Sequence, residues 1–232
     1  MGTLYLVRHG QASFGADNYD QLSPLGREQC VHLGRYWRES ERLGAYFAAK
    51  GLQFDAAFTG TLQRQIQTLA GICKGGGYSL AGVQRPGLNE YDSEAVIGAI
   101  HPHKLHKPTS KEEYRNHFRL LRDGLAQWMA GVVTPKGMPE YADWRDGIVE
   151  TLDLVRNSSH SNVLIVSSGG PISTVVGHIL GTSPETTIDL NMRIRNSSVT
   201  EFAFTPKRHM LVTYNTLPHL DDKSLESWIT YA

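Results

Sequence analysis

The chain has 232 residues, a length that one large domain with a sizeable buried core can account for. Lysine plus arginine equals aspartate plus glutamate at 23 each, so no overall field attracts nucleic acid or an anionic membrane surface, and any anion site must be local. The longest aliphatic run in the C-terminal half, residues 163–166, is far shorter than the roughly 20 residues of a membrane helix. We therefore expect one domain over residues 1–232, in the cytoplasm, with Cys30 and Cys73 as reduced thiols.

The first half of the chain predicts alternating strands and helices. Residues 4–7 form a short β-rich run, and Ser23 with Pro24 predicts the cap and first residue of a helix that ends near residue 49. Residues 55–59 predict a second strand. Thr61 is expected to cap the next helix, which ends at the glycine cluster of residues 75–77. The apolar face expected for that helix consists of Leu62, Ile66, Leu69, Ala70 and Cys73.

In the second half, the alternation is interrupted and then resumes. Residues 92–145 are rich in His, Lys and Arg, and we expect them to form an inserted helical cap, with helices near 111–131 and 141–157. Residues 162–167 predict a buried strand, and Pro171 predicts the start of a helix that ends before Gly181. Residues 198–204 and 210–214 predict a hairpin. The pattern indicates a three-layer α/β/α domain with a mostly parallel central sheet.

Polar residues gather where the predicted strands end. Ligands of open α/β sheets bind outside the carboxyl ends of the strands. The residues that this rule collects are Arg8, His9, Arg64, Glu90, Ser168, Gly169 and Gly170. Arginine holds phosphate oxygens in bidentate fashion, glycine N–H groups at a helix start can approach an anion, and a neutral imidazole can attack phosphorus. A glutamic acid can protonate the departing alkoxide, so these residues predict a pocket for a phosphoryl group.

Four segments together resemble the histidine phosphatase superfamily, which includes the cofactor-dependent phosphoglycerate mutases: residues 6–10 (LVRHG), 59–68 (TGTLQRQIQT), 88–90 (LNE) and 163–172 (VLIVSSGGPI). The resemblance covers nearly the whole chain and implies a phosphoglycerate mutase-like fold without a metal or other cofactor. It implies that His9 is the nucleophile that becomes phosphorylated. Arg8 and Arg64 would then hold the phosphate, and Glu90 would be the proton donor.

One position departs from the pattern of that family, which normally reads Ser-His-Gly-Gly where this chain has Ser167-Ser168-Gly169-Gly170. A serine hydroxyl donates one hydrogen bond but carries no positive charge, and the loss of one preorganised donor typically lowers a rate by about 100- to 1000-fold. Two interpretations of Ser168 stay open, a contact with the phosphate through its hydroxyl and a cap on the following helix. No nearby residue replaces the imidazole, because His178 lies roughly 15 Å along the helix axis.

The remaining candidates allow other interpretations. Asp92 or Glu94 could take the role of Glu90, and Arg64 could be a solvated helix residue or form a surface pair with an Asp or Glu. The histidine-rich residues 101–106 have no Cys or carboxylate nearby to complete a zinc site, so we expect no metal there. Val166 stands where a G-x-S-x-G elbow needs glycine, which argues against a serine nucleophile.

We expect a phosphatase-type enzyme that hydrolyses a phosphomonoester through a phosphohistidine, slowed by Ser168. The expected substrate is a small-molecule phosphoester or a phosphoprotein, and neither nucleic acid nor a membrane is expected as a partner. Two alternatives stay open: a regulatory protein that binds phosphate or a phosphoester without useful turnover, and a mutase that transfers the phosphoryl group. The sequence does not determine the oligomeric state.

Overall fold

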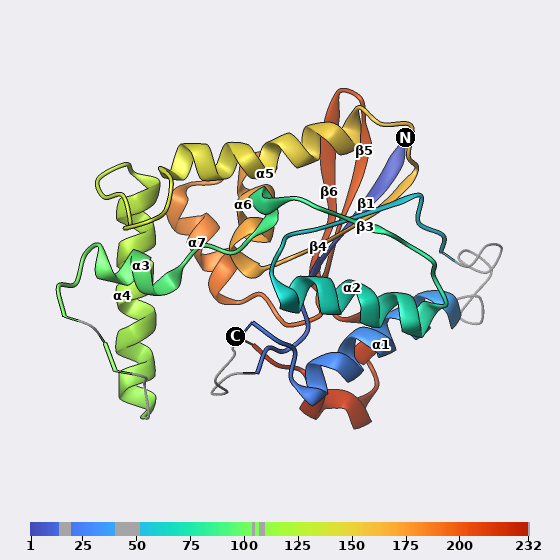
Figure 1. Cartoon of the computed structure of the whole chain (residues 1–232), viewed down its shortest axis with the longest axis horizontal. Helices are drawn as coiled ribbons and strands as arrows, with labels where there is room; N and C mark the ends of the chain where they lie inside the picture. The colour runs from blue at the N-terminus through green and yellow to red at the C-terminus, as the bar shows by residue number, and fades with distance from the viewer. Residues whose placement is uncertain (14–19, 40–51, 104, 107–109, 232) are drawn as a thin grey trace.

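A six-stranded mixed sheet organises the chain (Figure 1). The computed structural model describes residues 1–13, 20–39, 52–103, 105–106 and 110–231. The strand order across the sheet is β3-β2-β4-β1-β5-β6. The neighbours from β3 to β1 pair in parallel, whereas β5 pairs antiparallel with β1 and with β6. The strands are β1 (Gly2–Arg8), β2 (Ala56–Thr59), β3 (Gly82–Gln84), β4 (Asn162–Ser167), β5 (Val199–Thr205) and β6 (Arg208–Thr216).

The central strands are apolar on both faces because both faces are covered by helices. In β4, Val163 and Ile165 point into one hydrophobic cluster, and Leu164 and Val166 point into the other. All four side chains are almost fully buried. This alternation follows from the two-residue period of a strand.

Helices lie on both sides of the sheet. The cluster on one face combines side chains from α1 and α2 with those of the strands, and the cluster on the opposite face combines side chains from α5 and α6 with those of the strands. The predicted three-layer α/β/α architecture with a mostly parallel sheet is therefore confirmed. The helices are α1 (Pro24–Glu39), α2 (Gln63–Gly76), α3 (Ser93–Gly98), α4 (Lys111–Met129), α5 (Tyr141–Arg156), α6 (Gly169–Leu180) and α7 (Pro184–Met192), with 3-10 turns η2 (Pro86–Leu88), η3 (Pro218–Leu220) and η4 (Lys223–Trp228).

The helices α3 and α4 lie beside the sheet, at the left of Figure 1. They pack with α7 into a third hydrophobic cluster that contains Val96, Leu121, Trp128 and Ile188. Ser110 and Glu113 form a capping box that begins α4. The cap over residues 92–145 and the single-domain assignment stay predictions. Within the described ranges, no helix combines the length and hydropathy that a membrane crossing requires.

Two predicted helix boundaries were wrong, and a third lies partly outside the described residues. Thr61 does not cap α2, because its hydroxyl accepts a hydrogen bond from Asn89 and the first N–H of the helix, that of Gln63, donates to Asp20. The helix α6 begins at Gly169, two residues before Pro171, which still occupies the first turn, where a missing N–H costs little. The helix predicted to end near residue 49 is described only to Glu39, and residues 40–51 lie outside the described part.

The predicted apolar face of α2 was only partly right. Leu69 is buried, but Ala70 is exposed. The other buried side chains at the start of the helix are polar: Arg64, Gln65 and Thr68. These residues face the carboxyl ends of the strands, so this part of the helix serves the site more than the core.

Candidate active site

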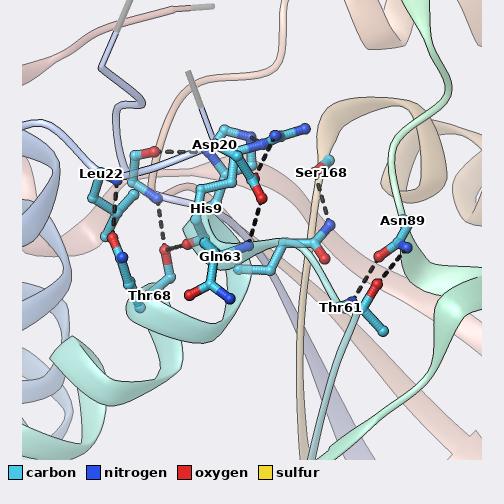
Figure 2. Close-up of polar contacts among 12 residues, drawn as sticks. His9, Asp20, Leu22, Thr61, Gln63, Thr68, Asn89 and Ser168 are labelled. Carbon is cyan, nitrogen blue, oxygen red and sulfur yellow. Dashed lines mark hydrogen bonds and ion pairs between the residues drawn. The ribbon is translucent and has the colours of Figure 1, made fainter. Parts of the chain in front are cut away.

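The carboxyl ends of the parallel strands β1 and β4 bring His9 and Ser168 to the same edge of the sheet (Figure 2). The β1–β4 register pairs Arg8 with Ser167, and the N–H of His9 donates to the carbonyl of Ser167 at 2.9 Å. His9 and Ser168 therefore follow two adjacent strands side by side. Arg64 lies in the first turn of α2, directly after β2, and reaches the same place.

The imidazole of His9 is held in one tautomer. His9 is 3% exposed, and its Nδ1 lies 2.7 Å from the carbonyl oxygen of Gly10. Because a carbonyl oxygen only accepts, Nδ1 must carry the proton. Nε2 therefore keeps its lone pair, and it accepts a hydrogen bond from Nε of Arg64 at 3.3 Å. His9 and Arg64, 55 positions apart in the chain, are in direct contact.

The surroundings keep this imidazole neutral. Burial lowers the pKa of His9 well below 6.5, and the nearby guanidinium groups of Arg8 and Arg64 lower the pKa further. The hydrogen bond with Gly10 opposes the shift without reversing it. A neutral imidazole with an available nitrogen lone pair is the form that can attack phosphorus.

Two arginines converge on His9, and each is anchored by an oxygen. Arg8 donates from one terminal nitrogen to the carbonyl of Ile194 at 2.5 Å. Arg64 donates to Asp20 at 2.8 Å, so it does form the pair with an acidic residue that one alternative interpretation proposed. Arg64 is only 8% exposed, however, so it is not a solvated surface arginine. Asp20 also accepts from the N–H of Gln63 at 2.9 Å. Asp20 thus fixes the start of α2 and the guanidinium of Arg64 together.

Glu90 reaches the start of α6. Its two carboxylate oxygens lie 3.1 and 3.2 Å from the N–H of Gly170, which donates to them. Burial raises the pKa of Glu90, although the Gly170 N–H and the positive charges of Arg64 and Arg8 oppose the shift. A raised pKa favours a carboxyl group that carries its proton, as a general acid must.

The other two carboxylates considered for this role lie elsewhere. Asp92 is exposed and caps α3, accepting from the N–H groups of Glu94 and Ala95. Glu94 is exposed in the first turn of the same helix. Of these three carboxylates, Glu90 is therefore the one that lies close enough to Arg8 and Arg64 for their charges to act on it.

Ser168 is fully buried and does not cap α6. It occupies the N-cap position without a side-chain hydrogen bond to the helix, so the interpretation as a helix cap was wrong. Its Oγ instead accepts a hydrogen bond at 2.8 Å from Nε2 of Gln65, which is also fully buried. His178 is exposed and does not substitute for an imidazole at this place.

Two backbone N–H groups at the start of α6 differ in their hydrogen bonds. The N–H of Gly170 is taken by Glu90, whereas the N–H of Gly169 has no hydrogen-bond acceptor among the described residues. An unsatisfied N–H at a helix start is suited to an anion. Gly169 thus offers an N–H at a helix start, and its role in binding phosphate stays a prediction.

Sequence reasoning missed Gln65, Asp20 and Thr68. Thr68 accepts from the N–H of Gly10 at 3.1 Å and donates to the carbonyl of Arg64 at 2.7 Å, which ties the loop after β1 to α2. The available signal was that polar residues 64, 65 and 68 interrupt the apolar period of the helix. Within the described part, no group of three or more His, Cys, Asp or Glu side chains is arranged to hold a metal ion.

The comparisons agree with this architecture. A family model described as the histidine phosphatase superfamily, branch 1, matches residues 4–217. A 2,3-bisphosphoglycerate-dependent phosphoglycerate mutase of Rhizobium etli is 35% identical over 102 residues, which are 42% of this chain and 46% of that protein. The aligned part thus spans less than half of that relative.

Two solved structures share the fold at low identity. A phosphoserine phosphatase mutant of Entamoeba histolytica in complex with phosphoserine has a TM-score of 0.60 and 20% identity, covering 95% of this chain and 100% of that one. The α-ribazole phosphatase of Shigella flexneri has a TM-score of 0.64 and 18% identity, covering 93% and 96%. Because the family model extends over nearly the whole chain, this protein belongs to branch 1 of the histidine phosphatase superfamily.

Proposed function

We propose that this protein hydrolyses a phosphomonoester through a phosphohistidine formed at Nε2 of His9. The observation that carries the proposal is the state of His9, a buried neutral imidazole whose Nε2 lone pair faces the guanidinium of Arg64. The expected substrate is a small-molecule phosphoester or a phosphoprotein. The relatives include phosphatases and a mutase, so the fate of the phosphoryl group is the question that an experiment must decide.

In the first step, Nε2 of His9 attacks phosphorus and the bond from phosphorus to the ester oxygen breaks. The leaving alkoxide takes the proton of Glu90, whose raised pKa keeps that proton available. Arg8 and Arg64 hold the oxygens of the transferred group, and Arg64 must exchange its contact with Nε2 for one with the phosphoryl group. The N–H of Gly169 adds a donor from the start of α6.

In the second step, water attacks the phosphorus of phospho-His9, and the carboxylate of Glu90 accepts a proton from that water. The bond from phosphorus to nitrogen breaks, inorganic phosphate leaves, and His9 returns to its neutral form. Glu90 then carries its proton again, so charges and protons balance over the cycle. If another hydroxyl replaced water in this step, the same site would act as a mutase.

The test is p-nitrophenyl phosphate turnover by the wild type and by His9→Ala, together with trapping of an acid-labile phosphoprotein at His9. We expect turnover that His9→Ala abolishes. Equal rates for the two proteins would contradict the proposal. If phosphate binds tightly to a wild type that shows no His9-dependent turnover, the protein is a phosphate-binding regulator. Transfer to an added phosphoglycerate rather than to water would indicate a mutase.

A further inference from the structure

We infer that Gln65 and Ser168 act as a pair that supplies the phosphoryl group with an oriented hydroxyl donor. In this pair Gln65 is a positioning residue, which acts through Ser168. The inference rests on the proposed function, because it assigns a role in the same phosphoryl site. It concerns the place where the family resemblance leads us to expect a second histidine.

The orientation of the Gln65 amide is determined by its surroundings. Nε2 of Gln65 lies 3.0 Å from the carbonyl oxygen of Leu88 and 2.8 Å from Oγ of Ser168. Because the carbonyl of Leu88 can only accept, the group that faces it must be the NH₂ and not the amide oxygen. The NH₂ therefore also donates to Ser168, and the positive end of the amide dipole faces the serine.

This contact determines what Ser168 can do. Its Oγ accepts from Gln65, so one lone pair of the oxygen is occupied. Ser168 makes no cap bond to α6, and its hydroxyl proton has no acceptor among the described residues. A fully buried hydroxyl proton without an acceptor is available to a ligand oxygen, since leaving it unused costs free energy.

The position of Ser168 makes the phosphoryl group the expected acceptor. Ser168 follows β4 beside His9, which follows β1, and it directly precedes Gly169, whose N–H also lacks an acceptor among the described residues. A donor that is itself polarised by a second hydrogen bond binds an anion more strongly than an isolated hydroxyl does.

The side chain of Gln65 also fills the space that a larger residue at position 168 would need. Gln65 and Ser168 are both fully buried and in contact, so an imidazole on residue 168 would collide with the amide. Gly60 packs against the other side of this amide, and a Cβ there would overlap Oε1 of Gln65. Gly60 therefore blocks one direction in which the amide could move aside, and we expect a histidine at position 168 to require a smaller residue at position 65.

The first test is a double-mutant cycle with Gln65→Met, Ser168→Ala and the double variant. Gln84→Met is the matched control, because Gln84 is exposed on the edge strand β3. The readouts are kcat for p-nitrophenyl phosphate and the dissociation constants of orthovanadate and inorganic phosphate, measured by calorimetry so that they do not depend on turnover. Orthovanadate is informative because it can adopt the five-coordinate geometry of the transition state, so a donor that acts there affects vanadate more than phosphate.

We expect Ser168→Ala to lower kcat by about 100-fold and to weaken vanadate binding more than phosphate binding. Gln65→Met should lower kcat and vanadate affinity by about 10-fold or more each. The double variant should lose no more activity or vanadate affinity than Ser168→Ala alone. Additive losses would show that Gln65 acts by another route, such as its bond to Leu88, and would overturn the inference. So would losses no larger than those of Gln84→Met.

The second test compares Ser168→His with Ser168→His combined with Gln65→Ala. We expect the single variant to lose activity because of the collision, and the double variant to recover at least wild-type kcat. A gain in the single variant, or no recovery in a folded double variant, would overturn the inference. If the wild type shows no His9-dependent turnover, the proposed function fails, and the vanadate and phosphate affinities in the cycle still decide whether the pair binds the anion.

Discussion

Replacement of Gly170 by alanine is expected to displace the proposed proton donor and leave the fold intact. A Cβ at residue 170 would overlap Oε1 of Glu90 and would lie 2.5 Å from Cε1 of Tyr91. Tyr91 has little freedom to move, because its hydroxyl accepts from Asn191 at 2.8 Å and its ring packs edge-on against Trp128. The carboxylate of Glu90 must therefore shift by about 1 Å and lose its bond with the N–H of residue 170.

The size of the effect depends on the leaving group. A misplacement of about 1 Å can lower a rate by about 100-fold, and a general acid contributes about 100- to 10,000-fold in total. We therefore expect Gly170→Ala to lower kcat by about 100-fold for an alkyl phosphate, whose leaving group is a strong base. The loss should be less than about 10-fold for p-nitrophenyl phosphate, whose leaving group needs little protonation.

The assay is steady-state phosphate release from both substrates, with circular dichroism to establish folding. Alanine is favoured over glycine in a helix by about 1 kcal/mol, so α6 should persist. Gly98→Ala is the control, because a Cβ there meets no atom within 4 Å. Unchanged turnover of the alkyl phosphate by a folded Gly170→Ala variant would refute the reasoning. An equal loss for both substrates would show that Glu90 does not protonate the leaving group.

Three further predictions concern charge. The kcat should stay level from well below pH 6.5, because His9 is already neutral there, and fall only above the raised pKa of Glu90. Glu90→Gln should abolish the fall in kcat at high pH. A kcat that rises through pH 6.5 would contradict both the neutral state of His9 and the protonated state of Glu90. Asp20→Ala should lower the free energy of unfolding by about 1 kcal/mol in urea titrations, whereas Asp20→Asn, which can still accept from Gln63, should lower it less. Burial lowers the pKa of His219 to about 3 in the folded chain. Below about pH 6.5, His219 therefore binds a proton in the unfolded chain but not in the folded chain. As the pH falls from 8 to 5, this difference in proton binding should lower the free energy of unfolding by about 2 kcal/mol. The free energy of unfolding of His219→Gln should fall correspondingly less than that of the wild type in the same urea titrations.

The part of the site that the sequence predicted follows from strand topology. Arg8 and His9 end one strand, and Arg64 comes just after another, so the rule for parallel sheets places them at one edge. The contact of 3.3 Å between Arg64 and His9 agrees with that rule. The same reasoning located Glu90 only roughly, because no strand end leads directly to it. Its place became clear only from its bond with Gly170.

The rest of the site depends on contacts between residues far apart in the chain. Gln65 and Ser168 are 103 positions apart, and Asp20 and Arg64 are 44 positions apart. A glutamine and an aspartate without such partners are expected to be exposed, so their residue types give no local signal of burial. The cap predicted at Thr61 failed for the same reason, since Asp20 reaches the helix start from a distant loop. Local patterns thus predicted most of the elements, although not β3, α3 or α7, and tertiary contacts determined where the predicted elements begin and end.

The two arginines link the charge states of the proposed nucleophile and acid. In the empty site, Arg8 and Arg64 lower the pKa of His9 and oppose the rise in the pKa of Glu90. A bound phosphoryl dianion offsets both guanidinium charges, so it removes the influence that favours the ionised form of Glu90. In the proposed reaction, substrate binding would therefore keep Glu90 protonated until the leaving group forms. Burial, the largest cause of the lowered pKa of His9, does not depend on those charges and continues to favour the neutral imidazole.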